Sequence, residues 1–126
     1  MEQDKRKDVR FVAGDDVVVV LPDKVSKIGR VIDIGQGGLA FELIDDEETT
    51  RWEFSKRDIS LWVNEFRVSD IPCKMVYDIP VQPPPEYELL SFHVKTRRCG
   101  VQFESLTENQ KGQLEFLLKT YTKGRI

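Results

Sequence analysis

The sequence predicts a mainly β fold, a small antiparallel barrel of six or seven strands with one C-terminal α-helix packed on it. Three observations predict this class. Apolar residues alternate along several short segments, turn-forming residues separate these segments, and no helical segment stands between them. A βαβ arrangement would need such helices, so antiparallel strands rolled into a barrel are the natural solution. The 126 residues, 40% of them hydrophobic, are enough for one domain with its own core.

Seven segments carry the β pattern. The first is a continuous β-branched run, typical of a strand covered on both faces, and the others alternate apolar and polar residues. The predicted strands cover residues 17–21, 27–34, 39–43, 59–63, 71–79, 90–94 and 99–103. A glycine-rich hairpin joins the second and third, and an acidic solvated loop at 45–48 follows.

The later strands are divided by three expected breaks. Ser69-Asp70 predicts a turn before the fifth strand. Prolines at 80 and 83–85 break the chain after it, because proline lacks the amide donor that a strand needs. Lys95, Arg97 and Arg98 predict a basic turn before the last strand.

A helix over about 107–121 is predicted to end the fold. Thr107 and Gln110 fit a capping box, in which each side chain bonds a free amide at the start of the helix. The residues that then recur at helical spacing are Leu114, Leu117, Leu118 and Tyr121. This apolar stripe needs a surface to cover, so we expect the helix to pack on the barrel rather than on a partner.

Composition narrows the class of protein. A net charge of -3 argues against a general DNA- or RNA-binding protein, which would carry a basic excess. No secretory signal opens the chain, and its longest apolar run, residues 17–21, is far shorter than a membrane span, so we expect a cytoplasmic protein without membrane insertion. Cys73, Cys99 and the single histidine, His93, lack the spacing of zinc ligands and predict buried free thiols and no metal. Without a Walker-type or dinucleotide-binding glycine motif or a convincing carboxylate pair, an enzyme is not expected.

One glycine-rich loop follows the second predicted strand. Gly35, Gly37 and Gly38 occupy three of four positions, and Asp33 stands at the entrance. Such glycines either form a tight turn or let a ligand approach bare main chain, and the sequence alone does not separate the two. Asp33 offers acceptor oxygens that suit the donor edge of a guanine as well as the amides of the loop itself.

The first ten residues are almost all polar or charged and cannot join a core. They predict either a solvated tail or a flexible arm. Arg6 and Arg10 give the second interpretation its chemistry, because two guanidiniums just before the first apolar residues are suited to folding over an anion. The chain is therefore divided into an arm, residues 1–10, and a single barrel domain, residues 11–126.

Two motifs occur in order along this chain. An Arg-x-x-x-Arg pair stands at residues 6–10, and a loop close to Asp-x-Ser-x-x-Gly stands at 33–38, after the second strand. Residues 98–103 and the capped helix complete the pattern, which resembles the PilZ domain family of bacterial cyclic di-GMP receptors over nearly the whole chain. The departure is Gly35, which stands where the family has a serine.

The resemblance implies a site for cyclic di-GMP, with no other cofactor. The expected ligand-binding residues are Arg6, Arg10, Asp33, Gly35 and Gly38, with Lys5, Gln36 and Gly37 as further candidates. An arginine fork meets the O6/N7 edge of guanine or a phosphate, and a carboxylate accepts from N1 and N2, a contact that adenine does not reproduce. Loss of the serine hydroxyl at position 35 is expected to weaken binding rather than abolish it.

The implied function is a cyclic di-GMP receptor or adaptor of bacterial second-messenger signalling. Binding would order the arm over the ligand and alter a surface for a separate protein effector, with motility, attachment or exopolysaccharide production as implied outputs. The alternative, motivated by Gly35, is a degenerate PilZ-like module that binds protein but no nucleotide. We expect a monomer, and the number of ligand molecules stays open because Lys5, just before the first arginine, gives no clear answer.

Overall fold

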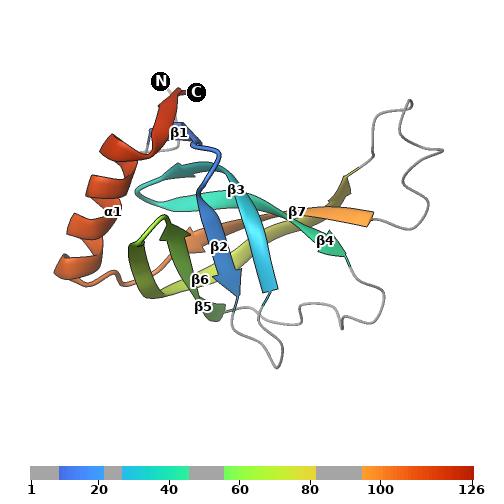
Figure 1. The fold of residues 1–126 in the computed structure, drawn as a ribbon. Coiled ribbons are helices and arrows are strands. Elements are labelled where there is room, and N and C mark those ends of the chain that lie inside the picture. The colour runs from blue at the N-terminus through green and yellow to red at the C-terminus, as the bar shows by residue number, and fades with distance from the viewer. Residues whose placement is uncertain (1–8, 22–26, 46–55, 82–94) are drawn as a thin grey trace, which may run out of the picture.

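The computed structural model describes residues 9–21, 27–45, 56–81 and 95–126 (Figure 1). The elements are β1 (Arg10–Ala13), β2 (Val18–Leu21), β3 (Lys27–Gly35), β4 (Gly38–Asp45), β5 (Lys56–Val63), β6 (Phe66–Val81), β7 (Lys95–Phe103), α1 (Glu108–Thr120) and β8 (Thr122–Arg125). The predicted loop residues 46–48, the prolines 83–85, the strand 90–94 and His93 lie outside the described residues.

Six strands close into an antiparallel barrel. The order is β2-β5-β6-β7-β4-β3, and a further pairing of β2 with β3 closes the sheet on itself. β1 pairs with β3 and carries β8 on its other edge, so these two short strands extend the barrel wall. The predicted mainly β fold, a small antiparallel barrel with a C-terminal helix, is confirmed.

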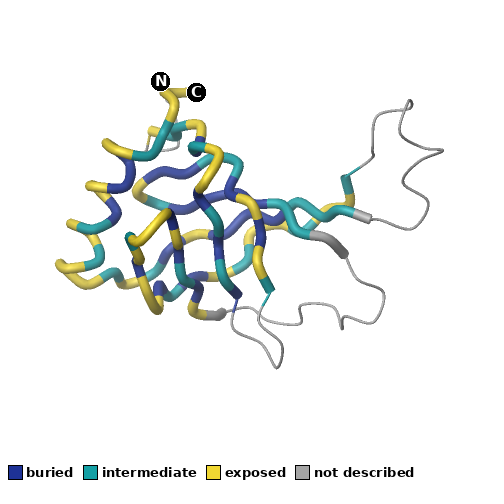
Figure 2. The backbone as a smooth tube through the Cα atoms, viewed as in Figure 1, coloured by how far each residue is buried: buried dark blue, intermediate teal, exposed yellow. Residues whose placement is uncertain are grey.

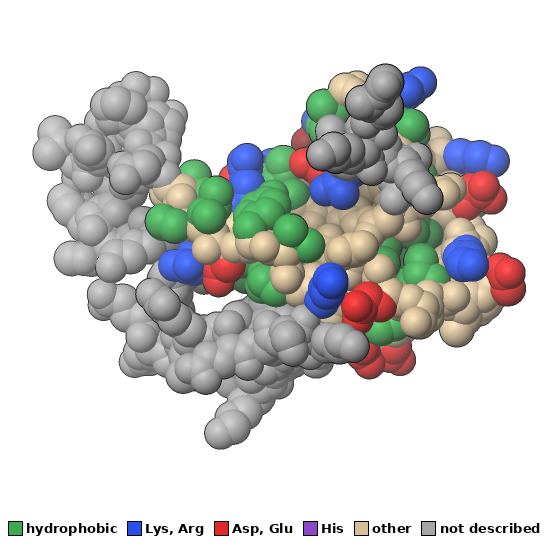
Figure 3. All heavy atoms as spheres, turned by 180° about the vertical axis from the view of Figure 1, so that it is seen from behind, with side chains coloured by type: hydrophobic (Ala, Val, Ile, Leu, Met, Phe, Trp, Pro, Cys, Tyr) green, Lys and Arg blue, Asp and Glu red, His purple; other side chains and the backbone are tan. Residues whose placement is uncertain are grey.

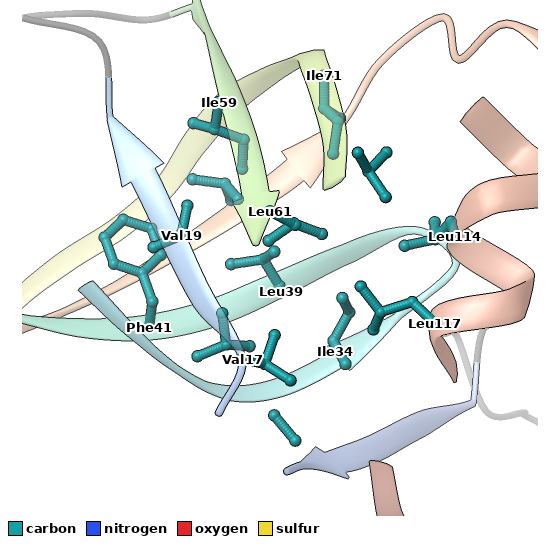
Figure 4. Packing of buried hydrophobic residues seen from close by; sticks show 14 of the residues in the cluster. Val17, Val19, Ile34, Leu39, Phe41, Ile59, Leu61, Ile71, Leu114 and Leu117 are labelled. Atoms are coloured by element: carbon teal, nitrogen blue, oxygen red, sulfur yellow. The ribbon is translucent and has the colours of Figure 1, made fainter. Parts of the chain in front are cut away.

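The core fills the inside of the barrel and extends to the helix. Buried positions alternate with exposed ones along the strands, so one face of each strand is apolar (Figure 2). Side chains such as Phe41, Leu39 and Leu61 point into the barrel, and Leu114 and Leu117 of α1 cover one side of it (Figure 4). The predicted helical stripe therefore packs on the barrel, with Leu117 fully buried.

The helix is joined to the barrel by its cap. The Thr107 hydroxyl accepts from the amide of Gln110, and the Gln110 side chain accepts from the amide of Thr107, both at 3.0 Å. The same Gln110 side chain donates to the carbonyls of Ser69 and Asp70 in β6 at 2.9 and 3.0 Å. The predicted capping box is present, and it also sets the position of the helix against β6.

The predicted turn at Ser69-Asp70 is wrong. β6 runs through both residues, and the chain turns instead at Asn64 and Glu65, between β5 and β6. Asn64 has a φ of 52°, a left-handed conformation that asparagine tolerates better than most residues. Asp70 has a φ of 56° inside β6, where the pairing of β5 with β6 shifts register between Ile59 and Leu61. Its left-handed conformation therefore produces an irregularity in the strand pairing and not a turn.

The predicted basic turn at Lys95, Arg97 and Arg98 is also wrong, because all three residues belong to β7. Arg97 donates to the Asp78 carboxylate at 2.6 Å, and Arg98 donates to Glu42. Carboxylates on the neighbouring strands pair with these two arginines. A basic segment whose composition is typical of a solvated turn therefore lies within a strand.

We expect Thr107→Ala to lower the free energy of unfolding by about 1 kcal/mol, because it removes the acceptor of one helix-end amide. Chemical denaturation measures the change. Asn109→Ala, at an exposed position of the same helical turn, is the control and should stay within about 0.5 kcal/mol of the wild type. Equal midpoints for Thr107→Ala and the wild type would show that the cap contributes nothing.

We expect the thiol of Cys73 to resist modification in the folded protein. Burial raises its pKa from 9.0 to about 12, with Asp58 and Glu104 adding to the rise. Above pH 9 the thiol loses its proton in the unfolded chain but keeps it in the folded protein. The raised pKa therefore contributes stability that is fully present below pH 9 and is lost as the pH rises toward 12. A thiol reagent at pH 8 should react only after denaturant is added, since both cysteines are buried and neither is in a disulfide; rapid reaction without denaturant would contradict this.

Candidate functional site

An irregularity in β3 decides where the Asp33 carboxylate points. The register of β3 against β4 shifts between Val31 and Asp33, so that the chain there holds an extra residue. Val31 and Ile34 are both buried although they are three residues apart, which a regular strand with a period of two does not allow. Asp33 is therefore half-buried on the outer face of the barrel, next to a fully buried Ile34.

Arg10 reaches Asp33 from the neighbouring strand. Its Nε and Nη2 donate to the same carboxylate oxygen, Oδ1, at 2.9 and 2.6 Å. The side chains are 22% and 23% exposed, so the pair is sheltered but open to a ligand on one side. Arg10, which the sequence places in the predicted arm, is the first residue of β1 and pairs with Gly35 of β3. The pairing of β1 with β3 thus brings together one residue from each predicted motif.

The glycines of the loop allow close approach of the protein's own backbone. A Cβ at Gly35 would lie 2.6 Å from the Val9 carbonyl oxygen and 3.1 Å from Cδ of Arg10. At Gly38 a Cβ would approach the Val101 carbonyl oxygen far too closely for any side chain. The side of these two residues on which a side chain would stand is therefore filled by β1 and β7, which leaves only their remaining main-chain atoms for contact with a ligand.

Gln36, at the tip of the hairpin, lies between two grooves. One groove of about 610 Å³ separates β1 and β8 from α1, and a second of about 510 Å³ lies on the other side of Gln36, along the start of α1. The first groove is lined by Val9, Phe11, Gln36, Glu115, Leu118, Lys119, Thr122, Lys123, Gly124 and Arg125. Its lining combines apolar side chains with charged and polar ones, which is the make-up of many small-molecule sites.

A cluster of charges that no sequence motif indicates lies on the same face. Glu42 of β4 pairs in register with Arg30 of β3 and with Arg98 of β7. Its carboxylate lies 2.5 Å from the Arg98 guanidinium and 3.6 Å from that of Arg30. One carboxylate between two guanidiniums leaves a local positive charge beside Asp33's strand. The sequence signal was a carboxylate, Glu42, between the apolar residues Phe41 and Leu43 of the predicted strand.

The structure thus brings together six of the predicted residues at one end of β1, β3 and β4. These are Arg10, Asp33, Gly35, Gln36, Gly37 and Gly38. Lys5 and Arg6 lie outside the described residues. Within the part of the chain that the structure describes, no group of three His, Cys, Asp or Glu side chains is placed to hold a metal ion, and no helix is long and apolar enough to cross a membrane.

Solved structures of other proteins share the barrel and its C-terminal helix. No family model and no curated protein matches the sequence. The structure is similar to the PilZ domain of Escherichia coli YcgR with c-di-GMP, at a TM-score of 0.69 and 12% identity over 94% of this chain and 92% of that chain. The chain has a PilZ-like fold.

Two longer proteins share this fold. Apo MrkH of K. pneumonia matches at a TM-score of 0.68 and 16% identity, over 96% of this chain and 50% of its own. Borreliella burgdorferi PlzA in complex with c-di-GMP matches at 0.54 and 11%, over 91% of this chain and 51% of its own. The chain therefore spans about half the length of these two proteins.

We expect Gly35→Ser to destabilise the protein by about 1 to 3 kcal/mol, because the new side chain would push against the Val9 carbonyl and force β1 away from β3. Gly112→Ala is the matched control. A Cβ at Gly112 meets nothing within 4 Å in α1, so this variant should gain about 0.5 to 1 kcal/mol. Thermal unfolding compares the two, and a Gly35→Ser variant as stable as the wild type would show that β1 is free to move.

Proposed function

We propose that this protein is a receptor for cyclic di-GMP and not an enzyme, and that it passes the signal on through a protein effector. The observation that carries the proposal is the Arg10–Asp33 pair beside the Gly35–Gly38 loop, on a barrel with a PilZ-like fold. YcgR and PlzA, which share the fold, are described with c-di-GMP bound, and MrkH is described as a c-di-GMP-dependent transcription regulatory factor.

Asp33 supplies the selectivity for guanine. Its carboxylate accepts two N–H bonds from Arg10 at Oδ1, and a carboxylate has acceptor capacity for more than two donors. The N1 and N2 groups of guanine are donors that suit this carboxylate, whereas adenine has no such pair on the corresponding edge. A bound adenine would add no such donors to this half-buried carboxylate and would displace the water that otherwise bonds it, which favours guanine.

Arg10 supplies both geometry and charge. Its contacts to Asp33 use Nε and Nη2, and the same planar fork can meet a guanine O6/N7 edge or a phosphate with its remaining donors. The pair is neutral in sum, so binding a ligand with two phosphates needs further cations. Arg98 and Arg30 stand on the same face, and Glu42 balances one of them.

Arg6 and Lys5 complete the proposed site from the arm. Arg6 is four positions before Arg10, so the backbone keeps it within about 14 Å of the start of β1. We assign ligand contacts to Arg6, Arg10, Asp33, Gly35 and Gly38, with Lys5, Gln36 and Gly37 beside them. Ordering the arm over the ligand would change the surface near β1 and α1, which is the output that an effector reads.

Calorimetric titration of the full chain with cyclic di-GMP tests the proposal. We expect saturable binding, no binding of cyclic di-AMP, and a loss of at least about 100-fold in affinity for Arg6→Ala/Arg10→Ala, since a good bidentate arginine contact contributes about 1 to 3 kcal/mol. Asp33→Ala should lose the preference for guanine. Arg67→Ala, which removes an exposed arginine at the β5–β6 turn, should bind like the wild type.

The opposite result has a defined meaning. No saturation at millimolar ligand would end the receptor proposal and leave the alternative, a PilZ-like module that acts through protein contacts alone. In that case a protein partner should bind the wild type and the Arg6→Ala/Arg10→Ala variant equally well. Gly35, whose side-chain position is filled by β1, is the observation that favours this alternative.

A further inference from the structure

A row of four residues crosses the outer face of the barrel from Asp33 to β6. Asp33 pairs with Ala40 of β4, and Ala40 pairs with Gly100 of β7. Gly100 pairs with Tyr77 of β6. Cross-strand partners share a face, so the Tyr77 ring lies on the face that carries the Asp33 carboxylate. With strands about 4.8 Å apart, the row is about 14 Å long, and the small residues in its middle place no long side chain between its ends.

Tyr77 is seated on Gly100. A Cβ at Gly100 would collide with Cε2 of the tyrosine and would lie 2.7 Å from both Cδ2 and Cζ. The two ring neighbours of Cε2 are both nearer than an edge-on approach to Cε2 would leave them, so the glycine faces the flat side of the ring rather than its edge. The tyrosine is 39% exposed, although one face of its ring rests on the sheet. It therefore presents an aromatic surface to solvent, held in place by the missing side chain at position 100.

An arginine lies on the same outer face as this ring, with its guanidinium bonded to Glu42 on the β4 side. Arg98 is two residues before Gly100 in β7 and projects from the same outer face, where it is 41% exposed. In the next row of the sheet it stands between Glu42 and Ile79, a residue of β6 that is 49% exposed. The view from behind shows hydrophobic side chains gathered toward the β6–β7 hairpin, with Lys and Arg side chains among them (Figure 3).

We propose that Tyr77 is the stacking surface for the second base of the bound dinucleotide, and that Arg98, on the same face between Glu42 and Ile79, meets a phosphate or the edge of that base. This inference rests on the proposed function, in which Arg10 and Asp33 hold the first base. A carboxylate and an arginine at one end of the row serve one guanine only. An exposed aromatic ring binds a purine through its flat face, and an arginine on the same face adds a donor for a phosphate or a base edge.

Titration of three variants with cyclic di-GMP tests the inference. Tyr77→Leu should weaken binding about tenfold or more, because stacking on the ring is lost, whereas Tyr77→Phe should bind within about threefold of the wild type. Trp62→Leu is the matched control. Trp62 is 38% exposed, close to the value for Tyr77, but it lies on β5, outside the row, and its ring faces Arg67 at 4.3 Å. This control should leave the affinity unchanged.

The outcomes separate the two proposals. Saturable binding to the wild type with equal affinity for Tyr77→Leu would overturn the role of Tyr77 and leave the receptor proposal standing, whereas no binding to the wild type would overturn both. If Tyr77→Leu does not fold, nuclear Overhauser effects in the wild-type complex decide. Contacts between guanine H8 and the Tyr77 ring protons are expected, and their absence in a saturated complex would contradict the inference.

Discussion

The extra residue in β3 is the constraint on which the outer face of the barrel depends. It allows Val31 and Ile34 to be buried together and turns Asp33 outward between them. In a regular strand the carboxylate would point with Val31 into the core, where an ionised group without partners is very costly. The same register then places Arg10 opposite Gly35 and Ala40 opposite Asp33. The ion pair follows from this irregularity, and the row toward β6 needs a second one, the register shift of β6 between Met75 and Tyr77 that turns the tyrosine outward.

The site lies on rigid elements because the barrel closes beneath it. β2 pairs with both β3 and β5, so the strand that carries Asp33 has no free edge within the barrel. Fully buried side chains from every wall meet below the site, and α1 is held against β6 through the Gln110 side chain. Ligand groups on such a frame keep their geometry.

Alternating apolar residues were enough to predict the barrel and its closing helix, because burial on one face is a local pattern. β1 and β8 do not show this pattern, since each has four residues and Thr122–Arg125 presents almost no apolar side chain. Backbone pairing alone defines them. The Arg98–Glu42 pair joins residues 56 positions apart, and the contact of Tyr77 with Gly100 depends on the β6–β7 register. No local pattern carries that register, so these two contacts were out of reach of the sequence.

Gly35 has a structural role that its position in the loop motif does not reveal. Its missing side chain lets the Val9 carbonyl and the Arg10 stem lie directly on β3. The guanidinium is then on Asp33 without any ligand, so a ligand that uses this pair meets an arginine that is already ordered. Because both arginine bonds end on Oδ1, a guanine that takes Oδ2 does not have to displace them. A chain with serine at this position would gain a hydroxyl for the ligand but would need β1 to move away. In the receptor that we propose, the glycine therefore exchanges a side-chain donor for a preformed arginine–carboxylate pair.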